Sequence, residues 1–407
     1  MDGAFEFEKD FKSAIDSGKI PGVVLMAKDA AEDKINYCWS HGLKTAKPDR
    51  KDAPDSAMTP DTPLRLASAS KIVATVMALQ CVERGYLGLD DDVQRFLPEL
   101  AQVQVLTGFD DSQNPLLRPP KCAITLRHLL AHTSGLAYIT EDEPLITKYR
   151  DLGFIPKVAS LQVAHRYGFP LSDDPGSRWI YGPNLDWAGK LVERATGLDL
   201  EEYMHQNICA PLGITDMTYK LQKRPDMVAR RADMSNRDAN GVPENTSASY
   251  LLEDPDDCFA GMGLFATPNA FMAVLHSLLK DDGKLLSPAM VDAIFQPQLD
   301  AAREKSLNIY MDGRNHGGLL PEAGIRRNHS LGGLMIMEDC EGDVWRRKGC
   351  ISWGGFPNLF WSIDREAGLC VLIAFQLIPF GDEQCVRLGR LFEKTIYKRL
   401  KESKSRH

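Results

Sequence analysis

An almost unbroken run of apolar residues is the feature of this 407-residue chain that most limits how it can fold. Residues 72–82 read Ile-Val-Ala-Thr-Val-Met-Ala-Leu-Gln-Cys-Val, and only Thr75 and Gln80 interrupt the run. A helix that is apolar on nearly every side is buried on most of them. Gly85 can end this helix, because glycine is common just past a helix C-terminus. We therefore expect the chain to fold around a central buried helix that begins near Lys71.

Strand-like segments lie toward both ends of the chain, and helical segments lie between them. Apolar runs at 23–26 and 35–39 predict a hairpin, and further strand-like runs follow near the C-terminus, at 331–337, 360–363 and 369–375. A closing helix is expected at about 383–400. This order fits an α/β (α+β) fold in which one sheet is built from both termini and a mostly helical lobe is inserted. The expected parts are a discontinuous sheet domain, residues 1–84 and 328–407, and a helical domain, residues 85–327.

Charge and cysteine usage argue against several classes of protein. The formal net charge is −8, whereas nucleic-acid-binding domains usually carry a basic face. The first 20 residues are charged and lack the apolar region of a signal peptide, and no run approaches the 18 apolar residues of a membrane span. The nine cysteines are odd in number and lack C-x-x-C spacing, which is typical of reduced intracellular thiols. We expect a cytoplasmic protein that binds neither nucleic acid nor membrane.

The segment Ser68-Ala-Ser-Lys71 places a serine one helical turn before a lysine. A Ser-x-x-Lys motif arises by chance about once in a chain of this length and ordinary composition. A second one does occur, Ser277-Leu-Leu-Lys280, in the last turn of a helix expected to be exposed. Ser68 differs because it immediately precedes the buried helix.

A serine at the start of a buried helix can be a nucleophile. Its backbone N–H is free to bind an oxyanion, and the positive end of the helix dipole lies beneath it. Lys71 follows one turn later on the same face, among apolar residues. Poor solvation favours a neutral lysine, which could act as a base toward Ser68. The alternative is a serine that only caps the helix, followed by a surface lysine.

Four further segments follow Ser68-x-x-Lys71 along the chain: residues 125–136, 175–184, 261–268 and 353–356. With these motifs in this order, the chain resembles the serine β-lactamases, the penicillin-binding proteins and their esterase relatives. Residues 77–81, 179–200 and 208–217 are in addition similar to the fungal polyketide acyltransferases of the lovastatin type.

The resemblance implies an antiparallel sheet of the β-lactamase/transpeptidase type, with the active site between the sheet domain and the helical domain. It implies that Tyr181 shares a proton with Lys71 and exchanges it with Ser68. The backbone N–H groups of Ser68 and Phe356 would bind the oxyanion, and Gly355 would let substrate approach closely. Asn184 is a candidate substrate contact, although it falls one residue later than in the family's Tyr-x-Asn motif. No metal and no cofactor are implied.

The third motif departs from the β-lactamase pattern. Trp353-Gly-Gly stands where β-lactamases have Lys-Thr-Gly, whose lysine and threonine hold the substrate carboxylate. An indole at this position makes an apolar wall, which suits a bulky neutral alcohol and gives a carboxylate no partner. The alternative is that Trp353 is plain core packing and the acceptor binds elsewhere.

The resemblance implies ping-pong acyl transfer through a Ser68 acyl-enzyme. The donor would be an acyl thioester, either CoA-like or carried by an acyl carrier protein domain of a polyketide synthase. The acceptor would be a hydroxyl of a polyketide-type natural product. A carboxylesterase or thioesterase differs only in using water as the acceptor. A non-catalytic binding protein is disfavoured because Ser68, Lys71 and Tyr181 occur together.

Other candidate sites are weaker. No Gly-x-Ser-x-Gly elbow is present, so an α/β-hydrolase is disfavoured. His128 and His132 have the i,i+4 spacing of helix neighbours, which is more often structural than metal-binding. The basic run Arg346-Arg-Lys348 is either a solvated strand edge or a contact for an acidic carrier protein.

Overall fold

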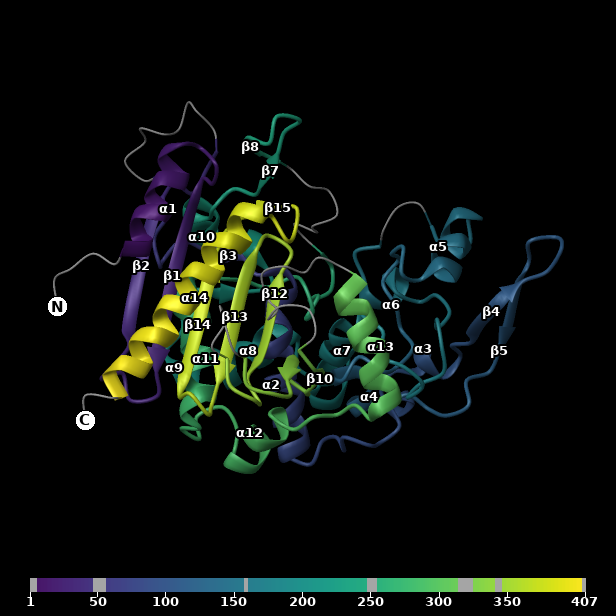
Figure 1. Ribbon diagram of the computed structural model, residues 1–407. Helices are drawn as coiled ribbons and strands as arrows, with labels where there is room; N and C mark the ends of the chain where they lie inside the picture. Colours follow the sequence, from purple (N-terminus) through teal and green to yellow (C-terminus); the bar gives the residue numbers. More distant parts are fainter. Residues whose placement is uncertain are drawn as a thin grey trace.

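The computed structural model describes residues 6–46, 56–156, 160–246, 255–313, 325–340 and 346–404. Its main layer is a seven-stranded antiparallel sheet with the order β10-β11-β12-β13-β14-β1-β2 (Figure 1). The N-terminal part supplies β1 (Gly22–Asp29) and β2 (Asn36–Gly42). The C-terminal part supplies β10 (Arg327–His329), β11 (Leu334–Ile336), β12 (Ile351–Gly355), β13 (Leu359–Asp364) and β14 (Leu369–Ala374). The prediction of one sheet built from both termini is confirmed.

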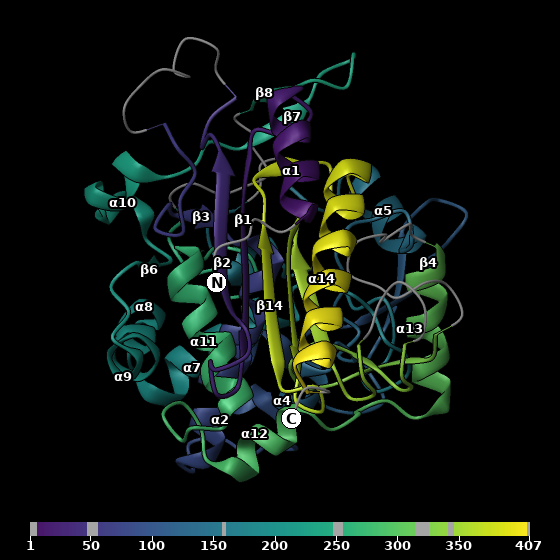
Figure 2. The same cartoon turned by 60° about the vertical axis from the view of Figure 1, so that its left-hand side comes forward.

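Helices cover both faces of this sheet. On one face, α1 (Glu6–Asp16) and α14 (Glu383–Lys404) lie side by side (Figures 1 and 2). On the other face, α11 (Pro268–Lys280) contacts β1, β13 and β14 (Figure 2). Every residue of β13 and β14 is buried, which explains why these strands are continuous apolar runs rather than alternating ones.

The predicted central helix is α2 (Lys71–Glu83), and its residues from Lys71 to Cys81 are all buried. It packs against α7 (Asn184–Thr196), which ends at Gly197 in the left-handed conformation. The short turn η2 (Ala67–Ser70) leads into α2 and contacts β12. The start of α2 therefore lies between the sheet and the helical part of the chain.

The remaining described elements form the helical part and three small sheets. The helices and turns are η3 (Val93–Arg95), α3 (Pro98–Ala101), α4 (Leu126–Leu130), α5 (Pro144–Asp151), α6 (Val163–Arg166), α8 (Leu200–Met204), η4 (His205–Cys209), α9 (Ala210–Leu212), η5 (Leu221–Lys223), α10 (Pro225–Arg230), α12 (Pro288–Ile294) and α13 (Ala301–Gly313). The strands are β3 (Leu64–Arg65), β4 (Val105–Phe109), β5 (Pro115–Arg118), β6 (Met217–Thr218), β7 (Ser235–Arg237), β8 (Pro243–Asn245), β9 (Phe265–Ala266) and β15 (Leu377–Ile378). The β4–β5 hairpin projects from the helical part (Figure 1). Because α11 falls in the range 85–327 but packs on the sheet, the division into two domains stays a prediction.

Two sequence expectations concern membrane spans and thiols. Within the described ranges, no helix combines the length and the apolar character that crossing a membrane requires. All nine cysteines lie in those ranges and are free thiols, of which only Cys38 and Cys122 are exposed.

The sequence allowed the basic run at 346–348 to be a solvated strand edge. That interpretation is wrong for Arg346, which is buried. The buried Arg346 guanidinium donates to both carboxylate oxygens of Glu393, at 2.7 and 3.1 Å, and to Ser352 Oγ at 3.0 Å. Glu393 lies on α14 and Ser352 on β12, so this pair fixes the closing helix to the sheet. Arg347 pairs with Asp339 at the surface.

We expect Arg346→Ala to lower the free energy of unfolding by about 3–5 kcal/mol, because it leaves the Glu393 carboxylate buried without its cation. Urea unfolding would measure the loss. Arg347→Ala is the matched control, since its pair with Asp339 is half-exposed on both sides and such pairs contribute about 0–1 kcal/mol. Equal losses in the two variants would contradict the structural importance of the buried pair.

Candidate active site

Ser68 lies at a strained bend between a strand and the central helix. The chain leaves β3, turns through η2 and enters α2 at Lys71. Ala67, the residue before Ser68, has φ 46°, which lies in the left-handed region that residues with a Cβ rarely adopt. Backbone strain of this kind concentrates at functional sites, where the surrounding structure enforces it. Ala67 and Ala69 are buried, whereas Ser68 is partly exposed.

The structure brings Lys71 and Tyr181 to the Ser68 hydroxyl. Tyr181 Oη donates to Ser68 Oγ at 2.7 Å, and Lys71 Nζ donates to the same atom at 3.1 Å. Lys71 Nζ also donates to the backbone carbonyl of Gly261 at 2.8 Å. Lys71 is only 4% exposed, so these acceptors replace the water that its amine would otherwise bind. Lys71, three residues along the chain, and Tyr181, 113 residues along, thus converge on the oxygen of Ser68.

Tyr181 is held by its own backbone and by a ring of aromatic side chains. The backbone N–H of Tyr138 donates to the Tyr181 carbonyl at 3.2 Å. The next residue must be a glycine, since a Cβ on Gly182 would lie 2.1 Å from the Leu136 carbonyl oxygen. Ring centroids within 6.3 Å of the Tyr181 ring belong to His132, Tyr138, Trp179, Tyr310 and Trp353. The phenol therefore has little freedom to leave Ser68.

Asn184 has a different environment from the one expected of a substrate contact. It is the first residue of α7 and is fully buried. Its amide oxygen accepts from Ser134 Oγ in a short hydrogen bond, and its amide nitrogen lies 2.9 Å from His132 Nδ1. Both ends of the amide are engaged inside the protein, so Asn184 supports the segment around Ser134 rather than facing a ligand.

The edge formed by β12 brings the third motif against the nucleophile segment. Trp353 is buried, and its ring centroid lies 5.4 Å from that of Tyr181. A Cβ on Gly355 would lie 2.0 Å from the Leu66 carbonyl oxygen, so only glycine allows β12 to come this close to the segment that carries Ser68. Phe356 follows at the end of the strand and is 39% exposed.

Several residues of the site carried no signal in the sequence. Two buried histidines, His132 and His329, lie with ring centroids 5.4 Å apart, and burial lowers the pKa of both, that of His329 to about 4. His132 and His128 do not share a ligand site, because His128 completes the capping box with Thr125 at the start of α4. Asp186 was also missed, and Gly261 was noted only as the start of the segment 261–268, since only the fold shows that both lie near Lys71.

A small cavity opens on the inner side of the site. It is lined by Lys71, Thr75, Leu130, His132, Leu185, His329, Leu331, Gly332, Gly333 and Trp353. At about 10 Å³ it has room for one water molecule at most, so an acyl chain does not fit behind Lys71. A substrate must therefore approach Ser68 from its partly exposed side.

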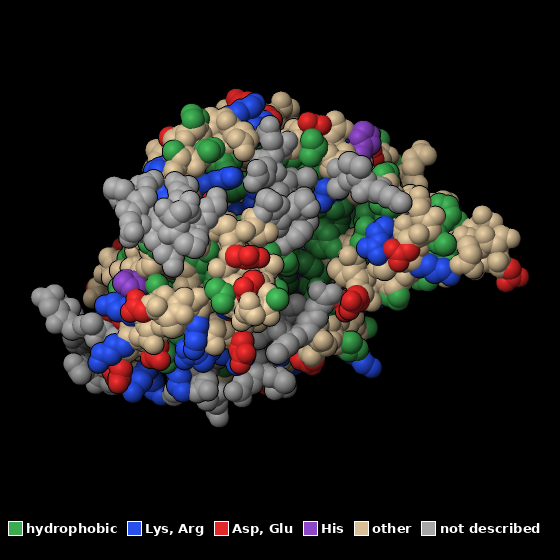
Figure 3. Space-filling model, turned by 90° about the horizontal axis from the view of Figure 1, so that it is seen from above, with side chains coloured by type: hydrophobic (Ala, Val, Ile, Leu, Met, Phe, Trp, Pro, Cys, Tyr) green, Lys and Arg blue, Asp and Glu red, His purple; other side chains and the backbone are tan. Residues whose placement is uncertain are grey.

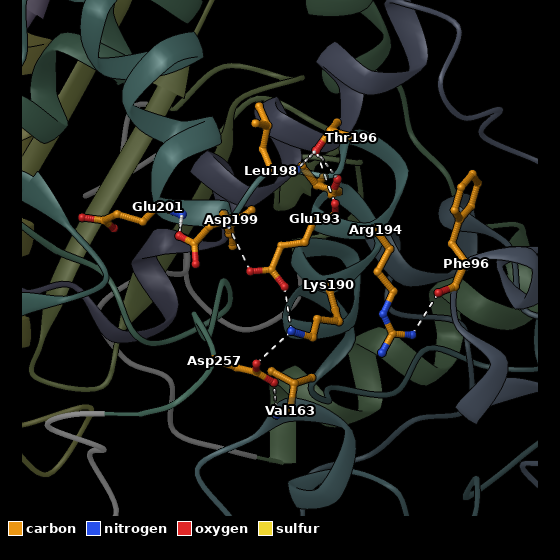
Figure 4. Close-up of polar contacts among 12 residues, drawn as sticks. Phe96, Val163, Lys190, Glu193, Arg194, Thr196, Leu198, Asp199, Glu201 and Asp257 are labelled. Atoms are coloured by element: carbon orange, nitrogen blue, oxygen red, sulfur yellow. Dashed lines mark hydrogen bonds and ion pairs between the residues drawn. The ribbon is translucent and has the colours of Figure 1, made fainter.

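One group of side chains in the described ranges has the spacing of metal ligands. Ligand atoms of Glu193, Asp199 and Cys258 lie within 4.8 Å of one another. Lys190 donates to Glu193 at 2.7 Å and to Asp257 at 2.8 Å (Figure 4), and Lys220 donates to Asp199 at 2.5 Å. Burial raises the pKa of the Cys258 thiol far above its usual range. Because lysines already pair with the carboxylates and the thiol holds its proton, we assign no metal here.

Comparison with known proteins gives the family. The Beta-lactamase family pattern matches residues 7–392. The monacolin J acid methylbutanoyltransferase of Aspergillus terreus is 49% identical over 394 residues, covering 96% of this chain and 94% of its own length. The lovastatin esterase of Penicillium rubens is 39% identical, covering 96% and 97%. A mutant of simvastatin synthase from Aspergillus terreus matches with a TM-score of 0.91 and 48% identity, covering 97% of both chains. The chain therefore belongs to the Beta-lactamase family and has its fold.

Proposed function

We propose that this protein is a serine acyltransferase that forms an acyl-enzyme on Ser68. The observation that carries the proposal is the pair of hydrogen bonds from Tyr181 and Lys71 to Ser68 Oγ. A hydroxyl that lies between a phenol and a buried amine can be deprotonated as it attacks, once the Tyr181–Lys71 pair has one proton fewer than its full number and can accept one. The names of the 49% identical methylbutanoyltransferase and of the simvastatin synthase support transfer of a short acyl group.

The reaction runs in two halves through the same atoms. Ser68 gives its proton to the Tyr181–Lys71 pair as Oγ bonds to the acyl carbon of a thioester, and the carbon–sulfur bond then breaks, with the proton passing to the departing sulfur. An acceptor hydroxyl next gives its proton to the same pair as its oxygen attacks the acyl carbon. The bond from Ser68 Oγ to carbon breaks, and Ser68 recovers a proton. The backbone N–H groups of Ser68 and Phe356 stabilise the oxyanion in both halves.

The acceptor is a bulky, largely apolar alcohol of the polyketide type. Seen from above, the molecular surface is hollowed, and hydrophobic side chains line most of the hollow (Figure 3). Trp353 is buried beside Tyr181, so this position of the third motif offers no cation to a charged acceptor. The A. terreus relative is named for monacolin J acid, which supports an acceptor of that class.

The donor is an acyl thioester, either CoA-like or held by an acyl carrier protein domain. The first residue of the basic run is not available to a carrier, because Arg346 is buried against Glu393. Arg347 and Lys348 are exposed, so an acidic carrier could contact this run only through those two side chains. The free thiols favour a reducing compartment, so a cytoplasmic location remains our prediction.

Hydrolysis of esters is the second candidate, and one relative favours it. The 39% identical P. rubens protein is named as an esterase, and it matches this chain over almost its whole length. Both activities pass through the same acyl-enzyme and differ only in the acceptor. The products formed from a butyryl thioester with and without an added polyketide alcohol distinguish them: ester formation supports transfer, and free acid alone supports hydrolysis.

Ser68→Ala should abolish covalent labelling by a fluorophosphonate, as measured by intact mass, while circular dichroism stays unchanged. The control is Ser277→Ala, the serine of the second Ser-x-x-Lys motif. Ser277 is buried rather than exposed as the sequence suggested, and its Oγ donates to Asp282 at 2.7 Å. Labelling that survives Ser68→Ala, or that disappears only with Ser277→Ala, would reject the nucleophile assignment.

Gly355→Ala should lower kcat/KM for p-nitrophenyl butyrate by about 100-fold or more, which is the cost of disturbing one oxyanion donor. The added methyl group would displace β12, and with it the N–H of Phe356, from the segment that carries Ser68. Gly389→Ala is the control, because its Cβ would meet Ile373 at an ordinary 3.4 Å. Wild-type kcat/KM in Gly355→Ala would show that the N–H of Phe356 is not a donor.

Nitrocefin should be a much poorer substrate than p-nitrophenyl butyrate. The carboxylate of a β-lactam would lie against Trp353 without a cationic partner, at a desolvation cost of several kcal/mol, roughly. Uncharged esters and thioesters avoid this cost. If kcat/KM for nitrocefin exceeded that for the ester, both the apolar wall and the acyltransferase proposal would have to be withdrawn.

A further inference from the structure

A buried carboxylate that the reaction above does not use lies beside the Lys71 amine. Asp186 is fully buried on the first turn of α7. Its Oδ1 accepts from the Gly261 backbone N–H at 2.8 Å, and the carbonyl of the same glycine accepts from Lys71 Nζ at 2.8 Å. Gly261 therefore bridges a buried anion and a buried cation, and the two charges also attract through space.

The segment that carries Gly261 is held in place without the charge of Asp186. Lys190, one turn further along α7, donates to Asp257 at 2.8 Å (Figure 4). Gly189 lets α7 approach Ala260 so closely that a Cβ would lie 2.5 Å from the Ala260 Cβ. From the other side, Ser70 Oγ donates to the Ala260 carbonyl at 3.1 Å. These contacts already fix residues 257–260 against α7 and η2.

The fold therefore does not require a carboxylate at position 186 and could be formed with a neutral amide there. Asp186 has two partners, the Gly261 backbone N–H on Oδ1 and the Tyr138 hydroxyl 3.5 Å from Oδ2. An asparagine amide could serve both, because its oxygen accepts from the N–H and its nitrogen can donate to the hydroxyl oxygen. Burial opposes ionisation and raises the pKa of Asp186 to about 6. Ionised Asp186 thus lowers the stability of the fold at neutral pH, which is typical of a charge kept for function.

We propose that the ionised carboxylate of Asp186 is a positioning residue for acylation, which holds the Lys71 amine in place against Ser68 Oγ. This inference rests on the acyl-enzyme function proposed above. The negative charge attracts the Lys71 amine, and the Gly261 peptide group, which hydrogen-bonds to both side chains, fixes the direction of the amine. Lys71 then stabilises the oxygen anion that forms as Ser68 and Tyr181 exchange their proton.

The surroundings of Asp186 single it out as the group that changes charge near pH 6. The titratable or charged side chains that act on it or are affected by it are Lys71, Tyr138, Arg166, Tyr167 and Tyr219. Burial raises the pKa of all three tyrosines, so they stay neutral there. Burial also lowers the pKa of the nearby His132 and His329, which are likewise uncharged. Acylation should accordingly slow as the pH falls through about 6 and Asp186 gains a proton.

The test compares Asp186→Asn with the wild type in the rate of Ser68 acylation by p-nitrophenyl butyrate between pH 5 and 9, together with Tm. We expect acylation at pH 8 to be slower by about 100-fold, the lower range for a group that assists proton transfer. The fall of the rate below pH 6 should disappear, because the variant resembles the protonated enzyme at every pH. Tm at pH 8 should be unchanged or higher, because the buried charge is gone.

Asp364→Asn is the matched control. Asp364 is an equally buried aspartate, and burial also raises its pKa, but it lies at the end of β13 and accepts from Tyr397 Oη at 2.9 Å. Its acylation rate and pH profile should match the wild type. Asp186→Ala, which leaves the Gly261 N–H without an acceptor, should lose both activity and Tm.

Two results would overturn the inference. In one, Asp186→Asn acylates Ser68 at the wild-type rate and still slows below pH 6, which would mean that the charge of Asp186 is unnecessary. The other is a Tm loss in Asp186→Asn as large as in Asp186→Ala, which would mean that the role is structural. A wild-type enzyme that forms no acyl-enzyme would instead reject the proposed function itself, so the two failures are distinguishable.

Discussion

The buried amine of Lys71 is the constraint on which the rest of the site depends. An amine on a helix that is buried on most sides loses its water, and it must find acceptors in the protein. Here Ser68 Oγ and the Gly261 carbonyl provide them, one from the turn before α2 and one from a segment 190 residues away. Satisfying one amine thus brings the nucleophile turn, α7 and the segment before β9 together. Tyr181 then reaches Ser68 because it directly precedes α7.

The sequence was informative where the signal was local. The apolar run after Lys71 predicted α2, and the strand-like runs predicted β1, β13 and β14, because periodicity and composition act over a few residues. Ser68 and Lys71 could be paired from their spacing, since one helical turn brings them onto the same face. Tyr181 entered only through resemblance, as nothing in its own segment indicates a serine 113 residues earlier.

The sequence was uninformative about polar groups that lie far apart along the chain and hydrogen-bond to each other in the fold. Arg346 looked like a surface residue, but Glu393 on α14 and Ser352 on β12 make its burial possible. Asn184 looked like a ligand contact, but Ser134 and His132 take up both ends of its amide. Asp186 was missed for the same reason, since its partners are a backbone N–H, which no residue type reveals, and the hydroxyl of Tyr138, 48 residues earlier in the chain. Such pairs depend on the fold, and a pattern along the chain does not record them.

Transfer and hydrolysis share every atom described at Ser68, so the difference between them must lie in what reaches the acyl-enzyme. The inner cavity admits one water molecule at most, and aromatic rings surround Tyr181, so water has few polar groups to bind near the base. An apolar alcohol bound on the exposed side of Ser68 would exclude water and place its hydroxyl beside Tyr181. The same site without such an alcohol would let water in and act as an esterase. We therefore expect the fit of the acceptor, rather than a change in the residues around Ser68, to decide which of the two activities this protein shows.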